Sequence, residues 1–438
     1  MVRQVNIRRL LNEMNIFKMK KLITVAVAVA LAVPAFAQGA LKHDSPERHG
    51  MNSEKLAQVD RVINDAIAAK EIPGAVLSVV RGNDIVYLKA YGNKSVVPTV
   101  EPMTTETMFD LASVSKCVGT TLAFMQLIEN GYVRLTDNVD RYIPNFKPWT
   151  DPESGKTVDI TVRDLLSHSS GLTPYINANT FVKEYGGNNP EKMEQYIATQ
   201  VKRNFRPGTD FMYSCLNFVT LQRILERVTG EKLYEYVQEH VFDALGLKHT
   251  CYFPLIYTPA VDNSAELARL CAPTEVQSDG KPLVAQVHDP MARMIMGGNS
   301  GNAGVFSNAE DLSVICSAIM NNGCLVDKKG NTLEATRILS PATVRLMATI
   351  PSQNDPSVGR ALGWDKKSSH SGPRGDLFNP ETTIMHTGYT GTSVVIDMES
   401  KTAIVLLTHR VHPEDKGGVG RLRALVANIV AGSIIQSN

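Results

Sequence analysis

Strand-like segments lie near both ends of this 438-residue chain, and a long helical stretch separates them. Two β-rich runs, 74–80 and 85–90, are joined by a short polar turn and predict a hairpin. Three more runs, 383–387, 393–397 and 402–408, stand near the C-terminus. We therefore predict an α+β fold of the α/β sandwich type. An antiparallel sheet built from both termini is flanked by helices and carries an inserted, mostly helical subdomain.

The sequence regions before, between and after these strand-like runs have the residue spacing of helices. Residues 53–69 have helical spacing before the first strand, and 419–434 are amphipathic after the last. In the middle, Thr161 with Asp164 predicts a capped helix start, and 217–228 carry apolar residues at helical intervals. We expect the sheet part to span about 51–135 and 300–435, and the helical part about 136–299.

The first 37 residues have the pattern of a secretory signal peptide. Three lysines precede an apolar run at 22–33, and Ala35-Phe36-Ala37 is a small-x-small cleavage pattern. The run is shorter than the roughly 20 residues that a membrane-spanning helix needs, so no stable membrane anchor is expected. We predict a signal peptide at 1–37, a linker at 38–50, the main folded domain at 51–435, and a periplasmic or secreted location.

Charge and cysteine content exclude some functions and leave others open. Without residues 1–37 the chain has 39 Lys and Arg against 43 Asp and Glu, a balance that disfavours nucleic acid as a partner. Six cysteines have no metal-site spacing, so no metal is predicted, and their pairing stays open among 15 connectivities and free thiols. They are Cys117, Cys215, Cys251, Cys271, Cys316 and Cys324.

Ser113 and Lys116 stand three residues apart at the start of a strongly apolar run at 118–128. The run predicts a helix that begins at the serine. Residues three apart share a helix face, so the amine of Lys116 can reach the hydroxyl of Ser113 and withdraw its proton. The S-x-x-K pattern alone is weak, because it recurs in a turn at 278–281 and an isolated pair is more often a surface feature.

Two later segments give the serine and lysine a context. Tyr213 stands in the segment 211–215, and His386-Thr387-Gly388 follows a strand-like run some 170 residues later. Together the three elements resemble the S-x-x-K, Y-x-N and K/H-T-G motifs of serine β-lactamases, DD-peptidases (penicillin-binding proteins) and family VIII carboxylesterases, in a class C-like form. The resemblance covers residues 50–435 and implies a β-lactamase/transpeptidase-like fold. Supporting stretches are 165–172, 207–209, 301–307 and 410–413.

The resemblance also implies a role for each matching residue. Ser113 would be the nucleophile that forms an acyl-enzyme, Lys116 would take its proton, and Tyr213 would share that role and protonate the leaving group. The backbone N–H groups of Ser113 and Tyr389 would form the oxyanion hole. His386, Thr387 and Gly388 would line the substrate cleft, with Gly388 allowing close approach to the backbone. No cofactor would be needed.

Two departures from the family motifs affect the expected substrate. Cys215 replaces the usual asparagine of the second motif, and Asn217 either takes over its substrate contact or is simply a helix-start residue. His386 replaces the lysine of most β-lactamases, and a largely neutral histidine anchors a penicillin carboxylate less well. Both changes disfavour an efficient β-lactamase.

Several functions remain open from the sequence. The segment around His288 and Asp289 is similar to one in secreted N-acetylmuramoyl-L-alanine amidases, although a His-Asp contact that holds a loop is the plainer interpretation. The leading hypothesis is a hydrolase of a peptidoglycan-derived or other small substrate, of DD-peptidase or muramoyl-amidase type. A carboxylesterase or weak β-lactamase is the first alternative. A non-catalytic module that binds penicillin or peptidoglycan is the second.

Overall fold

The computed structural model describes residues 41–253 and 264–435. The predicted signal peptide at 1–37 lies outside the described residues. Within the described part of the chain, no helix combines the length and the apolar character needed to cross a membrane.

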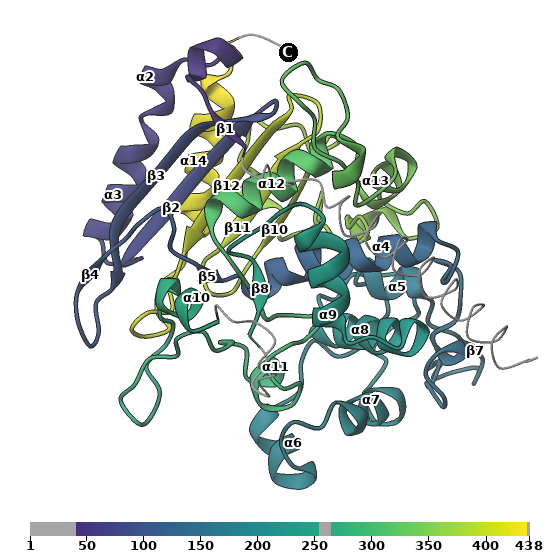
Figure 1. Cartoon of the computed structure of the whole chain (residues 1–438). Coiled ribbons are helices and arrows are strands. Elements are labelled where there is room, and N and C mark those ends of the chain that lie inside the picture. The colour runs from purple at the N-terminus through teal and green to yellow at the C-terminus, as the bar shows by residue number, and fades with distance from the viewer. Residues whose placement is uncertain (1–40, 254–263, 436–438) are drawn as a thin grey trace, which may run out of the picture. The chain divides into compact units, whose positions relative to one another are not determined.

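One sheet joins the two ends of the chain, as the sequence predicts. The N-terminal hairpin pairs with the C-terminal strands because β12 lies antiparallel to β2, with Leu406 opposite Leu77. The strand order is β1-β3-β2-β12-β11-β10, with β4 paired to β3 (Figure 1). Within this sheet β1 pairs parallel to β3, an addition that the sequence did not predict. The strands are β1 (Lys42–His43), β2 (Gly74–Arg81), β3 (Asp84–Ser95), β4 (Glu101–Pro102), β10 (Thr383–Thr387), β11 (Ser393–Asp397) and β12 (Thr402–Thr408).

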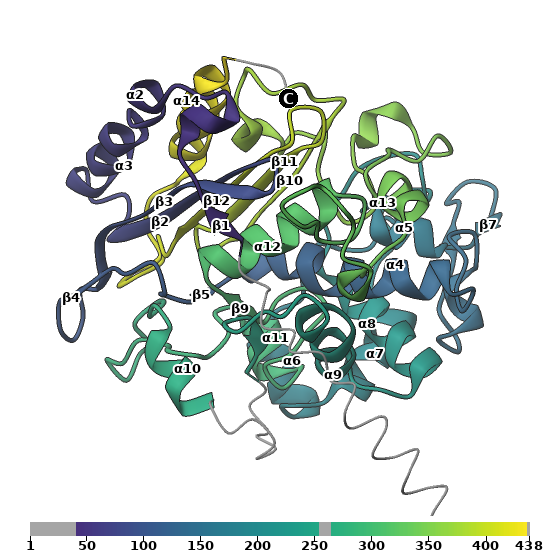
Figure 2. The same cartoon turned by 45° about the horizontal axis from the view of Figure 1, so that its top comes forward.

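Helices cover both faces of the sheet, so every residue of β2 is buried. Leu77 and Val79 point toward α2 (Ser53–Leu56), α3 (Val59–Ala68) and α14 (Gly420–Ser433) and share their apolar core. The alternate residues of β2 belong to a second, larger core. There α12 (Ala309–Met320) packs on β2 and β12. Figure 2 shows α12 on the face opposite α3 and α14.

The larger core continues into a helical part beside the sheet. α5 begins with the capping box predicted at Thr161 and Asp164, and α8 ends at Gly230, whose φ of 79° is the left-handed conformation of a helix stop. The helices are α4 (Leu122–Glu129), α5 (Val162–Leu166), α6 (Ala178–Tyr185), α7 (Pro190–Thr199), α8 (Cys215–Thr229), α9 (Leu233–Val237), α10 (Ser264–Leu270), α11 (Pro290–Met294) and α13 (Pro341–Met347).

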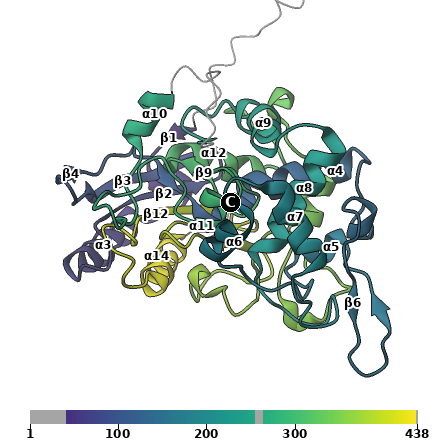
Figure 3. The ribbon, with the colours of Figure 1, turned by 90° about the horizontal axis from the view of Figure 1, so that it is seen from below.

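Short strands complete this part. A three-stranded sheet has the order β5-β9-β8, and its strand β5 leads directly into the segment that carries Ser113. A two-stranded hairpin of β6 and β7 projects at the edge of the helical part (Figure 3). These strands are β5 (Phe109–Asp110), β6 (Trp149–Thr150), β7 (Thr157–Val158), β8 (Cys251–Tyr252) and β9 (Val305–Ser307).

Candidate active site

Ser113 lies in a tight 3₁₀ turn, Ala112–Val114, directly after β5. The preceding residue, Ala112, has a φ of 46°, a conformation that is costly for a residue with a side chain. The carboxylate of Asp110 holds it there by accepting the Ala112 N–H at 2.8 Å. The helix predicted after the serine begins as a π-helix, Lys116–Thr121, and becomes α-helical only in α4. Strained turns and π-helical segments are both frequent at functional sites.

Lys116 is fully buried, and its amine meets three acceptors. The Nζ atom lies 2.9 Å from the Ser113 Oγ, 2.8 Å from the carbonyl oxygen of Asn302 and 3.6 Å from the Cys215 Sγ. The contact with Ser113 is the one expected from the three-residue spacing. An uncharged amine can donate to Asn302 and Cys215 while its lone pair accepts the proton of Ser113.

Tyr213 comes to the same place from the segment that precedes α8. Its ring lies 5.1 Å from the Lys116 Nζ on one side and stacks at 4.3 Å on the ring of His168. The hydroxyl of Tyr213 is buried and has no hydrogen-bond partner among the described residues. Tyr213 and Ser113 line one cavity of about 440 Å³. The structure therefore brings together the hydroxyl and amine of the first motif and the phenol of the second.

The end of β10 and the turn after it form another wall of this cavity. His386, Thr387, Gly388 and Tyr389 all line it. The turn is fastened to the Ser113 segment, because the hydroxyl of Thr392 donates to the carbonyl oxygen of Leu111 at 2.9 Å. This contact fixes the backbone of Tyr389 relative to that of Ser113.

Close packing around Gly388 leaves no space for a side chain at this position. A Cβ atom at this position would lie 2.3 Å from the Leu111 carbonyl oxygen and 2.2 Å from the Thr392 Oγ1. The sequence interpretation gave close substrate approach as the reason for this glycine. In the structure the close approach of the chain's own backbone before Ser113 already requires glycine, and the approach of a substrate stays a prediction.

His386 is buried, with 3% of its surface exposed. Its Nδ1 donates to the Thr387 carbonyl oxygen at 2.9 Å, which leaves the Nε2 lone pair as the second ring group. Burial, reinforced by the charges of Arg360 and Lys116, holds the pKa of His386 well below its ordinary value. The ring is therefore neutral near pH 7.

Arg360 supplies the cation that His386 does not. It lines the cavity, is 1% exposed and stacks its guanidinium 5.7 Å from the ring of Tyr213. One nitrogen, Nη1, donates to Asp365 at 2.9 Å, whereas Nε and Nη2 are buried without a partner among the described residues. Sequence analysis missed this residue, because a lone arginine between Gly359 and Ala361 belongs to no motif.

The two residues at the second motif have different places. Cys215 opens α8 with its sulfur near Lys116. Asn217, two residues further, is fully buried, accepts a hydrogen bond from the Ser170 hydroxyl at 2.6 Å and contacts the His168 ring at 3.2 Å. The amide of Asn217 thus contacts groups within the core. This favours its interpretation as a helix-start residue over its interpretation as a substrate contact.

His288 and Asp289 stabilise the loop through other partners than each other. The ring of His288 lies 3.2 Å from Glu275, and Asp289 caps α11 by accepting the Ala292 N–H at 2.7 Å. The backbone N–H of His288 donates to Asp110 at 2.7 Å. This loop therefore stabilises the carboxylate of Asp110, which also accepts the N–H of the strained residue Ala112.

The pKa of Lys116 is under opposing influences. Burial lowers it, the ionised forms of Cys215 and Tyr213 raise it more, and the net direction is upward. Burial, however, raises the pKa of both the Cys215 thiol and the Tyr213 phenol, so both are uncharged near neutral pH. Near neutral pH the contribution of Cys215 and Tyr213 is therefore small, while the charge of Asp289 continues to raise the pKa of Lys116 against the effect of burial.

Elsewhere in the described residues, two surface clusters have the geometry to offer metal ligands, Asp44 with His49 and Asp84, and Glu231 with Glu239 and His240. In the first the imidazole already contacts Asp44 at 3.3 Å. All six cysteines are free thiols, which answers the pairing question that the sequence left open.

Comparison with known proteins agrees with the geometry. The family model for Beta-lactamase matches residues 59–428. A putative D-alanyl-D-alanine carboxypeptidase of Escherichia coli O157:H7 is 32% identical over 412 residues, covering 88% of this chain and 89% of that protein. The N-acetylmuramyl-L-alanine amidase of Bacillus subtilis strain 168 is 32% identical over 378 residues and covers 82% of each chain.

Solved structures share the fold. EstCE1, a hydrolase with promiscuous acyltransferase activity, superposes with a TM-score of 0.64 at 26% identity, covering 86% of this chain and 99% of its own. The octameric penicillin-binding protein homologue from Pyrococcus abyssi has a TM-score of 0.63 at 21% identity, covering 86% of this chain and 78% of its own.

Fold and relatives together define a serine hydrolase with the β-lactamase/transpeptidase-like architecture that the sequence predicted. The chain belongs to the Beta-lactamase family, and its curated relatives are named as D-alanyl-D-alanine carboxypeptidase and N-acetylmuramyl-L-alanine amidase.

Proposed function

We propose that this serine hydrolase cleaves an amide bond in a small peptidoglycan-derived peptide through an acyl-enzyme on Ser113. The observation that carries the proposal is the 2.9 Å contact between the Lys116 Nζ and the Ser113 Oγ beside the cavity. In its uncharged form the amine takes the hydroxyl proton as the oxygen attacks the carbonyl carbon.

The remaining steps use groups that line the same cavity. The backbone N–H groups of Ser113 and Tyr389 stabilise the oxyanion that forms when the carbonyl is attacked. Tyr213, a phenol near neutral pH, is suited to donate a proton to the leaving amine and recover one from Lys116. Water then attacks the acyl-enzyme while Lys116 accepts a proton from it. The bond between the acyl group and the Ser113 oxygen breaks, the acid product leaves, and Lys116 returns the proton to the Ser113 oxygen.

The charge of the cavity favours a substrate that bears a free carboxylate. Three arginines line the cavity, Arg360, Arg410 and Arg423, against one acidic side chain, Asp365. A buried guanidinium with two free N–H groups can bind a carboxylate in a bidentate manner, and Arg360 offers such a pair. This argument favours a carboxypeptidase, whose substrate ends in a carboxylate. The names of the E. coli relatives support the same choice.

A muramoyl-amidase activity is the second candidate, and the B. subtilis relative at 32% identity favours it. Carboxylesterase and weak β-lactamase activities are further alternatives, and the neutral His386 argues against efficient penicillin turnover. A non-catalytic binder is the least favoured, because the contact between Lys116 and Ser113 is that of an activated nucleophile.

We also propose that the protein is exported, with a signal peptide at 1–37, a linker at 38–50 and the hydrolase domain at 51–435. Within this domain the sheet part would span about 51–135 and 300–435, and the helical part about 136–299. A periplasmic or secreted location would bring the enzyme to a peptidoglycan substrate. Sequencing the N-terminus of the protein purified from its native host tests the cleavage after Ala37.

Turnover of four substrates tests the proposed activity. D-alanyl-D-alanine peptides, muropeptides with an intact muramoyl amide, a nitrophenyl ester and nitrocefin are each incubated with the wild type and with Ser113→Ala. We expect release of the terminal alanine by the wild type and no turnover by the variant. Undiminished peptide cleavage by Ser113→Ala would refute the role of Ser113, and cleavage of the muramoyl amide alone would favour the amidase.

A further inference from the structure

We propose that Gln222 is a positioning residue, which acts through the Gly301–Asn302 backbone to hold the carbonyl oxygen that binds Lys116. The inference rests on the proposed role of Lys116 as the base. Gln222 lies on α8, two turns after Cys215, and is 2% exposed.

Both the oxygen and the nitrogen of the Gln222 side-chain amide contact the backbone of the segment that follows α11. Its Oε1 accepts the Gly301 N–H at 2.9 Å, and its Nε2 lies 3.4 Å from the Asn299 carbonyl oxygen. The residue after Gly301 is Asn302, whose carbonyl oxygen accepts from the Lys116 Nζ at 2.8 Å. Gln222 therefore holds the residue directly before the one whose carbonyl Lys116 uses.

The segment is seated tightly on α8. A Cβ atom at Gly301 would lie 2.0 Å from the Phe218 carbonyl oxygen, so only glycine permits this approach. On its other side the Thr120 hydroxyl donates to the Gly301 carbonyl oxygen at 2.8 Å. Because Thr120 belongs to the same π-helix as Lys116, Gly301 is held between this helix and α8.

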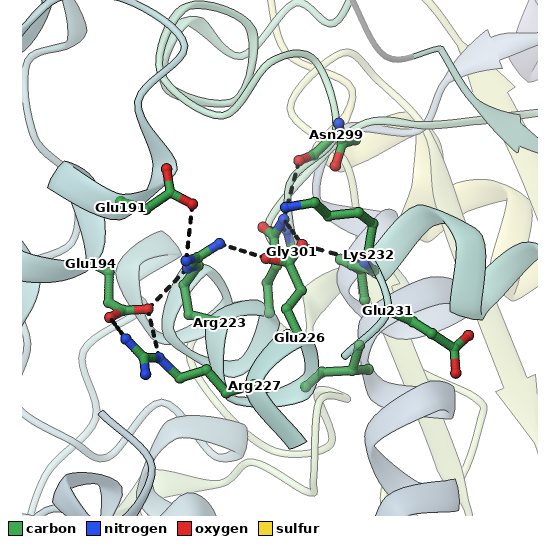
Figure 4. Close-up of polar contacts among 12 residues, drawn as sticks. Glu191, Glu194, Arg223, Glu226, Arg227, Glu231, Lys232, Asn299 and Gly301 are labelled. Atoms are coloured by element: carbon green, nitrogen blue, oxygen red, sulfur yellow. Dashed lines mark hydrogen bonds and ion pairs between the residues drawn. The ribbon is translucent and has the colours of Figure 1, made fainter. Parts of the chain in front are cut away.

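A buried charge network orients the Gln222 amide. Glu226 accepts from the Gln222 Nε2 at 3.1 Å, so the amide oxygen faces Gly301. Glu226 itself is held by Arg223 at 2.6 Å, and Arg223 also donates to Glu194 of α7 at 2.9 Å. Figure 4 shows Arg223 between the glutamates of α7 and α8, with Gly301 and Asn299 at the other end of the network.

The function of this arrangement is to keep the Lys116 amine aimed at Ser113. Asn302 accepts one amine hydrogen, which leaves the lone pair free to point toward the Ser113 hydroxyl. Without a fixed carbonyl the buried amine loses both its orientation and the acceptor that stabilises its charged form.

Replacing Gln222 by methionine tests the inference, because Gln222→Met keeps the side-chain length but removes both amide contacts. Gln222→Met leaves unchanged the other groups that interact electrostatically with Lys116, and also Arg360, which like Lys116 lies over the Tyr213 ring. They are Cys117, His168, Tyr213, Cys215, Asp289, Arg360 and His386. The measured quantity is kcat/KM for a nitrophenyl ester as a function of pH, whose acid limb reports loss of the proton from Lys116.

We expect Gln222→Met to lower the plateau of kcat/KM by about tenfold and to move the acid limb to lower pH by about one unit, since an acceptor of the charged amine is weakened. Thr120→Val loosens Gly301 from the opposite side, so we expect the same direction of change. It also provides the test if Gln222→Met does not fold.

Arg227→Gln is the matched control. Arg227 lies on α8, like Gln222, and the substitution breaks its 2.5 Å ion pair with Glu194 of α7, but Arg227 contacts neither Gln222 nor Gly301. We expect a lower melting temperature and an unchanged pH profile. Unchanged profiles in both Gln222→Met and Thr120→Val would overturn the inference. If instead Lys116→Met were fully active, the proposed role of Lys116 itself would fail.

Discussion

Arg360 gives the sharpest prediction about substrate choice. Its Nε and Nη2 groups are buried at the cavity wall without a partner in the described part of the chain, and Nη1 is already engaged by Asp365. A substrate carboxylate would therefore gain two charge-assisted hydrogen bonds, worth about 3 kcal/mol together, or about 100-fold in kcat/KM. Arg360→Met should remove this gain.

The assay compares two substrates on two enzymes. A D-alanyl-D-alanine peptide with a free carboxylate and the same peptide with a terminal amide are cleaved by the wild type and by Arg360→Met. Arg360→Met also disturbs Asp365, but that disturbance affects both substrates equally and cancels in the cycle. We expect about a 100-fold loss of kcat/KM for the free acid and little loss for the amide.

Arg410→Met serves as the control in this experiment. Arg410 lines the same cavity, but its Nη1 already donates to Asp415 at 2.7 Å and its Nε to the Tyr389 carbonyl oxygen at 2.8 Å. It should lower both activities to the same degree. An equal loss for the acid and the amide in Arg360→Met would refute the carboxylate contact.

Three further predictions concern the surroundings of the site. Gly388→Ala forces a Cβ against the Leu111 carbonyl oxygen; we expect about 1–3 kcal/mol of destabilisation in urea together with reduced turnover. Cys215→Asn puts a stronger acceptor beside Lys116, so the acid limb of the kcat/KM profile should move to higher pH, and a shift to lower pH would contradict this. Burial lowers the pKa of His409 from 6.5 to about 3, so the folded state resists protonation and loses stability as the pH falls below 6.5. His409→Phe should remove about 3 kcal/mol of the stability difference between about pH 7 and about pH 4.5, measured by urea unfolding, and an unchanged difference would argue against a neutral buried ring.

The sequence predicts the sheet well because its signals are local. The runs at 383–387, 393–397 and 402–408 coincide with β10, β11 and β12, since polar turns bound each of them. The helix predicted at 53–69 is in fact two, α2 and α3, interrupted at 57–58. The apolar run at 118–128 predicted a helix but not its π-helical beginning, because apolar spacing does not distinguish the two hydrogen-bond patterns.

The site was predicted where motifs exist and missed where contacts cross the fold. Ser113, Lys116 and Tyr213 each lie in a recognisable motif, and the structure brings them to one place. Arg360 has no sequence signal, because its importance comes from burial beside Tyr213. Asn217 was considered for substrate contact on its spacing alone, whereas its neighbours Ser170 and His168 come from a distant loop.

The most direct test of the central claim is to locate the covalent intermediate. The wild type, Ser113→Ala and Lys116→Met are incubated with a fluorophosphonate probe and with penicillin, and the adduct is mapped by peptide mass spectrometry. We predict one adduct on Ser113 in the wild type, none in Ser113→Ala, and strongly slowed labelling in Lys116→Met. Labelling of another residue, or equal rates in the wild type and Lys116→Met, would contradict the assignment of nucleophile and base.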